Sequence, residues 1–189
     1  MKQKIFTITD WIHQVLSLYI EEGDLCIDAT VGKGKDTLYL CEKTGTSGKV
    51  IAFDVQKDAI DAAKQLITEH GYEENVQFVL DGHEHMDSYA KEESAAVILF
   101  NLGYLPGGDH QIATRKETTL AALEKGIRIL KNEGILCVCI YSGGDTGFEE
   151  KEAVLDWVEK LPAKEYDVIV SSFQNKPNCP PLPVFIRKR

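Results

Sequence analysis

Short apolar runs alternate with helical stretches along almost the whole chain, and this alternation restricts the fold more than any other feature. The runs have the length of buried strands, and the stretches between them repeat apolar residues every three or four positions. Strands separated by helices build βαβ units, which favour a mainly parallel sheet with helices on both faces. The seven expected strands are 25–29, 49–55, 76–80, 95–101, 134–141, 166–173 and 183–188.

The stretches between the strands indicate which connections are helical. The expected helices are 8–20, 36–42, 57–70, 114–130 and 149–161, with a weaker one at 84–91. The connection between the last two strands carries no helical pattern, so a hairpin-like link should make the last strand antiparallel to its neighbour. The 189 residues suffice for one domain and are few for two, so we expect a single domain over 1–189.

Composition excludes several classes of protein. The formal net charge of −9 argues against coating nucleic acid through a broad positive field, so any RNA contact must be local. No apolar stretch approaches the roughly 18 residues of a membrane helix, and residues 1–8 are too polar for a secretory signal. We therefore expect a cytoplasmic protein that does not contact membranes.

Cysteine and histidine spacing gives no indication of a metal. None of the five cysteines forms a C-x2-C pair with histidines at zinc spacing, and His83 and His85 lack a further clustered ligand. The cysteines lie in or beside apolar runs, so we expect buried, reduced thiols and no metal site.

A glycine-rich loop, DATVGKGKD at 28–36, follows the first expected strand. Its glycines suit a backbone that approaches a ligand closely and then turns into a helix. The dinucleotide fingerprint G-x-G-x-x-G fails, because Thr37 stands at the third glycine position, and this disfavours a dehydrogenase. The second strand ends at Asp54, where a carboxylate can accept hydrogen bonds from the ribose hydroxyls of an adenosine, the alternative being a helix cap.

The third strand ends at Asp81, which either meets an adenine amino group or forms an ordinary turn. Open α/β sheets bind ligands at the carboxyl ends of their strands, where all these acids and glycines fall. This order resembles that of class I S-adenosylmethionine (AdoMet) methyltransferases, which implies that the loop wraps the methionine moiety and the second acid holds the ribose. The expected cofactor-binding residues are Asp28, Ala29, Thr30, Gly32, Lys33, Gly34, Asp36, Thr37, Asp54, Val55, Gln56, Asp81, Gly82, His83, Asn101 and Leu102.

The fourth strand delivers Asn101 to the same edge, ahead of Tyr104 and a Pro-Gly-Gly loop. Methyl transfer to an amine needs the nitrogen lone pair in line with the sulfonium carbon, at about 3–3.5 Å. An asparagine carbonyl can accept a hydrogen bond from an amine N–H and so orient that lone pair. Methyltransferases acting on amines use an Asn/Asp-Pro-Pro-aromatic loop here, which residues 101–104 match in the first and fourth places only. The alternative is a turn with a surface aromatic.

Further polar residues are candidates for contacting the acceptor. Tyr104 can stack on a base. Asp109 is suited to positioning a charged amine and His110 to accepting a proton, although both also fit a solvated loop. The expected catalytic residues are Asn101, Tyr104, Asp109 and His110, and the expected substrate-binding residues are Tyr104, Gly107, Gly108, Arg115, Tyr141, Asn175, Asn178 and Pro180.

Nearly the whole chain resembles the YtqB-like family, long labelled rRNA methylases and now identified with the tRNA methyltransferase MnmM. The matching blocks, in order, are DATVGKGKDT, AFDVQ, NLGYLPGGDH, a Thr-Thr pair before a long helix, IYSGG and an N-x-x-N-x-PP tail. The resemblance implies AdoMet-dependent methylation of 5-aminomethyl(-2-thio)uridine at wobble position 34, with the tRNA anticodon stem-loop as partner. A homodimer is compatible with this reading, but no residue argues for one.

Two positions depart from the family pattern. Lys33 stands where the family usually has Asn, and Gly144 stands where it usually has His. Lys33 can still reach a cofactor carboxylate, whereas the missing His removes a proton acceptor or phosphate contact. The alternatives are therefore an AdoMet methyltransferase for rRNA or a small-molecule amine, and a cofactor-binding protein without methyl transfer.

Overall fold

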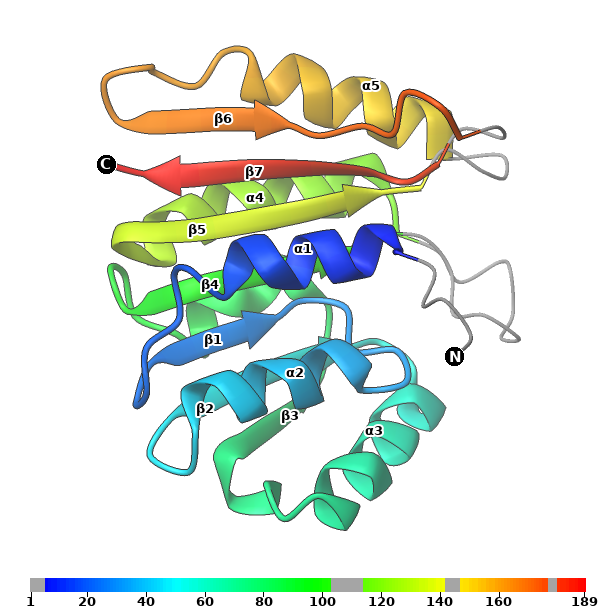
Figure 1. The fold of residues 1–189 in the computed structure, drawn as a ribbon, viewed down its shortest axis with the longest axis vertical. Helices are drawn as coiled ribbons and strands as arrows, with labels where there is room; N and C mark the ends of the chain where they lie inside the picture. The colour runs from blue at the N-terminus through cyan, green and yellow to red at the C-terminus, as the bar shows by residue number, and fades with distance from the viewer. Residues whose placement is uncertain (1–5, 103–113, 142–146, 177–179) are drawn as a thin grey trace.

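The fold was analysed in a computed structural model that describes residues 6–102, 114–141, 147–176 and 180–189. A seven-stranded sheet with the order β3-β2-β1-β4-β5-β7-β6 forms its centre (Figure 1). The first five strands pair in parallel, and β7 runs antiparallel to both β5 and β6, so the expected fold class and antiparallel last strand are confirmed. The strands are β1 (Leu25–Asp28), β2 (Lys49–Asp54), β3 (Val76–Leu80), β4 (Ala95–Asn101), β5 (Leu130–Ile140), β6 (Tyr166–Val170) and β7 (Leu182–Lys188).

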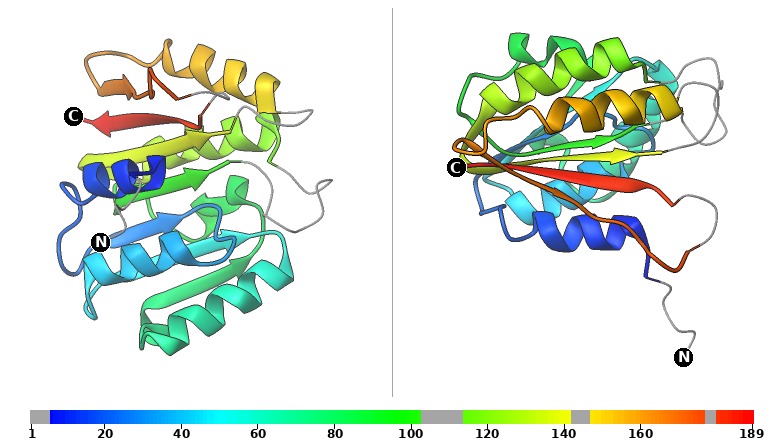
Figure 2. Two further views of the ribbon diagram at one scale, coloured as in Figure 1. Left: turned by 45° about the vertical axis from the view of Figure 1, so that its right-hand side comes forward. Right: turned by 90° about the horizontal axis from the view of Figure 1, so that it is seen from above.

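Helices cover both faces of the sheet (Figure 2). On one face, α1 (Ile8–Leu16), α2 (Lys35–Thr44) and α3 (Lys57–Glu69) share a core cluster with alternate residues of the central strands. On the other, α4 (Lys116–Ile129) and α5 (Gly147–Val158) pack on the intervening residues, together with the 3-10 helix η2 (His83–Ser88). A second 3-10 helix, η1 (Glu73–Asn75), precedes β3. Side chains that alternate between two apolar faces explain why the strands read as continuous apolar runs.

Helix α1 begins at a capping box. Thr7 Oγ1 accepts a hydrogen bond from the Asp10 backbone N–H at 3.1 Å, and Asp10 Oδ2 accepts one from the Thr7 N–H at 2.9 Å. The buried residues of α1 belong to the same cluster as Ile135 of β5 and Phe185 of β7. The chain just before α1 also meets the C-terminal tail, because the Phe6 and Phe173 rings contact edge to face with centroids 6.3 Å apart.

Most of the expected bounds differ from the observed ones by no more than three residues, and three elements depart further. The weak helix at 84–91 is the 3-10 helix η2, whose buried His83 and Met86 are three residues apart, the period of that helix. Strand β5 begins at Leu130, which pairs with Ala95 before an irregular stretch that includes Glu133 at φ +64°. Helix α1 ends at Leu16, four residues earlier than 8–20 predicts.

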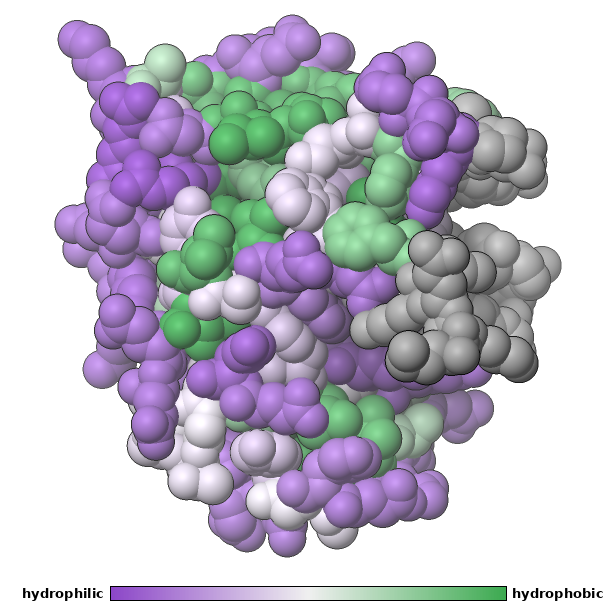
Figure 3. All heavy atoms as spheres, in the orientation of Figure 1, coloured by the Kyte–Doolittle hydropathy of each residue, from purple (hydrophilic) through white to green (hydrophobic). Residues whose placement is uncertain are grey.

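The face drawn in Figure 3 is mostly polar, and apolar side chains are exposed on the edge strand β6. Ile169 is 61% exposed there. None of the described helices has the length and apolar character that crossing a bilayer requires. The buried thiols are confirmed for the four cysteines that the structure describes, which are Cys26, Cys41, Cys137 and Cys139.

Helices α4 and α5 are joined by a buried carboxylate. Glu150 is 3% exposed, and its two oxygens accept hydrogen bonds from the hydroxyls of Thr119 at 2.7 Å and Thr114 at 2.9 Å. Burial raises the pKa of Glu150, and the two threonine hydroxyls oppose that rise. The two helices are thus fixed to each other by a polar contact inside an apolar layer.

We expect Thr119→Val to lower the free energy of unfolding by about 1–3 kcal/mol, because it leaves a buried carboxylate oxygen without its donor. Urea denaturation followed by circular dichroism measures this loss. Thr118→Val is the matched control, since its hydroxyl donates to the Arg115 carbonyl at the exposed start of α4. Equal losses in the two variants would show that the Glu150 contact contributes nothing specific.

Candidate active site

The strand order reverses between β1 and β4, which lie side by side at the centre of the sheet (Figure 1). Chain connections leave these two strands toward opposite faces, so a crevice opens beyond their carboxyl ends, and open α/β sheets bind ligands there. Backbone hydrogen bonds extend the pairing past the strands: Ala29 N–H donates to Leu99 O at 2.8 Å, and Leu102 N–H donates to Cys139 O at 2.9 Å. Most of the predicted cofactor residues lie around this point.

Asp28 holds the loop after β1 in shape. It is 1% exposed; its Oδ2 accepts from the Thr37 hydroxyl at 2.6 Å and its Oδ1 from the Thr30 N–H at 3.1 Å. The Thr30 hydroxyl in turn accepts from the backbone N–H of Asn101 at 2.7 Å. The side chains of Asp28 and Thr37 are buried against each other and therefore stabilise the loop.

Burial raises the pKa of Asp28 to about 7, the neighbouring Asp36 carboxylate adds to the rise, and the Thr37 and Thr30 hydrogen bonds oppose it. A carboxyl whose pKa is raised by folding contributes stability below its ordinary pKa and loses that contribution as the pH rises through the folded-state value. The stability that Asp28 contributes is thus lost as the pH approaches neutrality.

We expect the wild type to lose stability relative to Asp28→Asn as the pH rises from about 5 to about 8. The variant cannot ionise, so it lacks the cost of a buried charge at the higher pH. Unfolding free energies from urea titrations at both pH values measure the difference. Asp58→Asn, at an exposed position of α3, controls for charge removal, and a pH dependence of Asp28→Asn parallel to the wild type would contradict the expectation.

Asp54 joins the glycine-rich loop to the end of β2. Its Oδ2 accepts from the Gly32 N–H at 3.0 Å and its Oδ1 from the Gln56 N–H at 2.9 Å. Gln56, rather than Asp54, occupies the N-cap position of α3. The half-buried carboxylate keeps further lone pairs for ribose hydroxyls, and Val55 beside it exposes 59% of its apolar surface. This pair fits the ribose and adenine of a nucleoside.

The glycines of the loop adopt left-handed backbone angles, with φ +52° at Gly32 and +78° at Gly34. Gly34 also touches α3, since a Cβ built on it would lie 2.8 Å from the Ala63 Cβ. The intervening Lys33 is exposed. Glycine at position 34 is thus required by both backbone angle and space.

Asn101 ends β4 with its two amide atoms in different environments. Its Nδ2 donates to Asp36 Oδ2 at 3.1 Å, whereas its Oδ1 is buried and accepts no hydrogen bond within the described part of the chain. Burial raises the pKa of the nearby Tyr141, and contact with the Asn101 side chain opposes that rise. Buried polar atoms are normally hydrogen-bonded, so this carbonyl oxygen is available to a donor from a bound molecule.

The end of β3 presents two polar groups with different partners. Asp81 accepts from the Gly82 N–H at 2.8 Å and contacts His85 Nδ1 at 2.8 Å; the hydrogen bond with His85 lowers the Asp81 pKa. His83 turns inward, with Nδ1 3.1 Å from the Ala29 carbonyl and Nε2 buried without a partner among the described residues. Burial lowers the His83 pKa and so favours the neutral ring. The adenine contact of Asp81 stays a prediction.

Four predicted substrate residues can be placed. Arg115 is the exposed N-cap residue of α4, Tyr141 is 39% exposed just after β5, Asn175 is exposed, and Pro180 is partly buried. These roles stay predictions. Outside the described residues lie Tyr104, Gly107, Gly108, Asp109, His110, Gly144 and Asn178.

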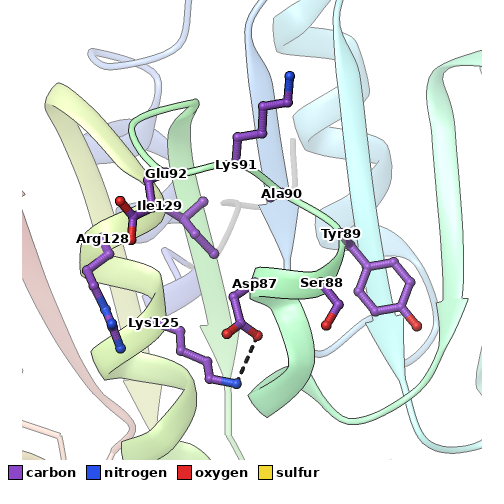
Figure 4. A pocket seen from close by; sticks show the side chains of 9 residues that line it. All are labelled: Asp87, Ser88, Tyr89, Ala90, Lys91, Glu92, Lys125, Arg128 and Ile129. Carbon is purple, nitrogen blue, oxygen red and sulfur yellow. Dashed lines mark hydrogen bonds and ion pairs between the residues drawn. The ribbon is translucent and has the colours of Figure 1, made fainter.

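A pocket of about 490 Å³ lies apart from this crevice, between the segment after η2 and the C-terminal half of α4 (Figure 4). Lys125 and Asp87 form an ion pair at 2.8 Å on its wall. The pocket lies toward the amino ends of β4 and β5, because the Arg128 carbonyl beside it accepts from the Glu93 N–H just before β4. Among the described residues, no group of three or more His, Cys, Asp and Glu gathers at a spacing that would hold a metal.

The chain is similar to known methyltransferases. Residues 50–187 match the family model described as "Putative rRNA methylase". A protein from Arabidopsis thaliana named "tRNA (mnm(5)s(2)U34)-methyltransferase, chloroplastic" is 36% identical over 190 residues, which cover 96% of this chain and 69% of that relative.

Two crystal structures are similar over almost their whole length. One, from Clostridium thermocellum, is described as a "putative rRNA-methylase"; its TM-score is 0.94 at 41% identity, with 99% of this chain and 100% of that chain covered. The other, from Streptococcus mutans, is described as a "putative methyltransferase" in complex with SAH, the demethylated form of AdoMet. Its TM-score is 0.87 at 35% identity, with 98% of this chain and 99% of that chain covered. The fold, the crevice and these relatives together place the chain in the rRNA methylase family, as an AdoMet-dependent methyltransferase.

Proposed function

We propose that this enzyme methylates the primary amine of 5-aminomethyl(-2-thio)uridine at position 34 of tRNA, giving 5-methylaminomethyl(-2-thio)uridine. The observation that carries the proposal is the buried Asn101 Oδ1, which has no partner among the described residues at the switch point of the sheet. An unpaired buried acceptor costs about 1–3 kcal/mol, which a donor on a bound molecule removes. A primary amine brings such a donor.

The cofactor, when bound, supplies an electrophilic methyl group on its sulfonium. Asp54 and the loop that it braces at Gly32 are the residues that would hold its nucleoside and methionine parts. Asn101 Oδ1 accepts a hydrogen bond from an N–H of the acceptor amine and thereby orients the nitrogen lone pair for attack. With the cofactor bound, the amine nitrogen would form a bond to the methyl carbon as the sulfur–carbon bond breaks, and the resulting ammonium group would release its extra proton to water.

The choice of tRNA over other acceptors is supported by the Arabidopsis relative, whose name specifies the U34 nucleotide and whose similarity spans 96% of this chain. The acidic net charge of −9 requires the RNA contact to be local. A contact with a few exposed nucleotides of an anticodon loop meets this requirement. Base stacking on Tyr104 belongs to this proposal. The family description favours a second candidate, methylation of rRNA.

Nucleoside mass spectrometry with methyl-deuterated AdoMet tests the proposal. The substrates are one tRNA carrying 5-aminomethyluridine at position 34 and the same tRNA with unmodified uridine there. We expect one deuterated methyl group on the modified nucleoside and none on the control. Labelling of rRNA or of a free amine, with no labelling of either tRNA, would overturn the tRNA assignment.

Two carboxylate variants link the activity to the crevice. Asp54→Asn should abolish labelling at low AdoMet, because an amide oxygen and an amide N–H replace two acceptor oxygens that hold Gly32 and Gln56. Asp58→Asn, on the exposed face of α3, should label at the wild-type rate. Equal rates in the two variants would remove Asp54 from the cofactor site.

A further inference from the structure

Asp36 lies between two side chains that come from distant parts of the chain. Its Oδ2 accepts from Asn101 Nδ2 at 3.1 Å, and its Oδ1 lies 2.8 Å from His13 Nε2. Asp36 belongs to the first turn of α2, Asn101 ends β4, and His13 lies on α1. Both carboxylate oxygens are thus turned toward protein groups, although the sequence predicts Asp36 as a cofactor ligand.

This contact decides which way the Asn101 amide faces. A carboxylate only accepts hydrogen bonds, whereas an amide has a donating and an accepting end. With Asp36 on one side, the amide can only present its NH2 group there, so Oδ1 must face the opposite direction. That oxygen is the buried acceptor without a partner among the described residues. Without Asp36, the amide would lose the carboxylate that holds its NH2 group on that side.

His13 is itself held in a fixed position. Its ring stacks on Tyr39, with centroids 3.7 Å apart and an interplanar angle of 5°. The Tyr39 hydroxyl donates to the His13 backbone carbonyl at 2.5 Å. Because the Asp36 carboxylate only accepts, His13 Nε2 is the donor in their contact. The side chains of His13 and Asp36 are 24% and 13% exposed, so little water competes for these bonds.

We propose that Asp36 and His13 are positioning residues, which lock the Asn101 amide with its Oδ1 toward the acceptor amine. The proposal rests on the proposed function, in which Asn101 receives that amine. Asp36 sets the direction of the amide, and His13 fixes the carboxylate rotamer that does so. The N-terminal helix α1 thereby takes part in methyl transfer through its contact with Asp36.

Kinetics separate positioning from cofactor binding. We expect Asp36→Asn to lower kcat by about 10- to 100-fold, as misplacement of a reacting group does, while the Kd for AdoMet from calorimetry changes by less than about twofold. A direct cofactor ligand would show the reverse: a weaker Kd, with kcat restored at saturating AdoMet. Glu42→Gln removes a charge from an exposed position of the same helix and should change neither value.

A conservative pair tests His13. Glutamine carries an Nε2 donor, whereas leucine fills similar space without one. His13→Gln should therefore retain several times the kcat of His13→Leu, with equal unfolding free energies checked by urea denaturation. Equal kcat values for the two variants at equal stability would overturn the role of His13.

The Asn101 side-chain amide signals in a 15N–1H spectrum give a readout that needs no acceptor. They are assigned by their loss in Asn101→Ala. We expect Asp36→Asn to shift or broaden them in the SAH-bound protein and Glu42→Gln to leave them unchanged; signals unmoved by Asp36→Asn would overturn the proposal. The wild type could methylate no tRNA while the Asn101 amide signals still respond to Asp36→Asn as expected. That result would overturn the U34 assignment and leave the positioning role of Asp36 intact.

Discussion

Asn101→Ala should lower kcat by about 100-fold at saturating AdoMet and tRNA, because it removes a fixed acceptor from a buried reaction site. Its Oδ1 is buried with no partner among the described residues, so the free enzyme loses no internal hydrogen bond at that atom. The backbone N–H bond from Asn101 to the Thr30 hydroxyl survives the substitution. The Kd for AdoMet should therefore stay within about threefold of the wild-type value.

Single-turnover labelling with preloaded AdoMet measures this change without a contribution from product release. Asn132→Ala is the matched control, since Asn132 is exposed near the start of β5, at the opposite edge of the sheet. It should react at the wild-type rate. A wild-type rate for Asn101→Ala would remove the amide from the mechanism and leave only its backbone in the site.

Gly34→Ala should lower the free energy of unfolding by about 2–5 kcal/mol and weaken AdoMet binding in parallel. Two costs add at this position. The left-handed backbone at φ +78° costs an alanine about 1–2 kcal/mol. The new Cβ would also lie 2.8 Å from the Ala63 Cβ and 2.9 Å from its Cα, and such overpacking costs about 1–3 kcal/mol.

Two further variants separate these costs. Gly71 has φ +76° and nothing within 4 Å of a Cβ built on it, so Gly71→Ala should show the backbone cost alone. Adding Ala63→Gly to Gly34→Ala removes the nearest side-chain atom and should restore part of the stability. Urea denaturation measures all four proteins. Equal losses for Gly34→Ala and Gly71→Ala would show that the loop moves away from α3 at no cost.

Strand periodicity and length predicted the sheet because buried parallel strands need apolar side chains on both faces. Positions 95–101 illustrate this: every residue but Asn101 is buried, and the strand has the predicted bounds. Strand pairing that depends on tertiary contacts was harder to predict. Leu130 joins β5 only because Ala95 lies opposite it, and no pattern in residues 130–134 indicates that pairing.

Among the residues of the candidate site, too, some locations could be predicted from the sequence and others could not. The locations of Asp54 and Asn101 were predictable, because polar residues that follow apolar runs fall at the carboxyl edge of a parallel sheet. His13 was not, since it lies 23 residues before Asp36 on an amphipathic helix, where a histidine gives no sign of its partner. Nor did the sequence indicate that the Thr30 hydroxyl accepts a hydrogen bond from the Asn101 backbone N–H, whereas a cofactor contact of Thr30 stays a prediction.

The packing of α1 also bears on the order in which the protein is made. Its buried face shares a cluster with Phe185 of β7, and Lys176 Nζ donates to the Phe6 carbonyl at 3.1 Å, so the earliest helix is completed by the latest strand. During translation, the cluster that buries α1 therefore stays incomplete until β7 has been made, although it already contains residues of β1, α2 and β4.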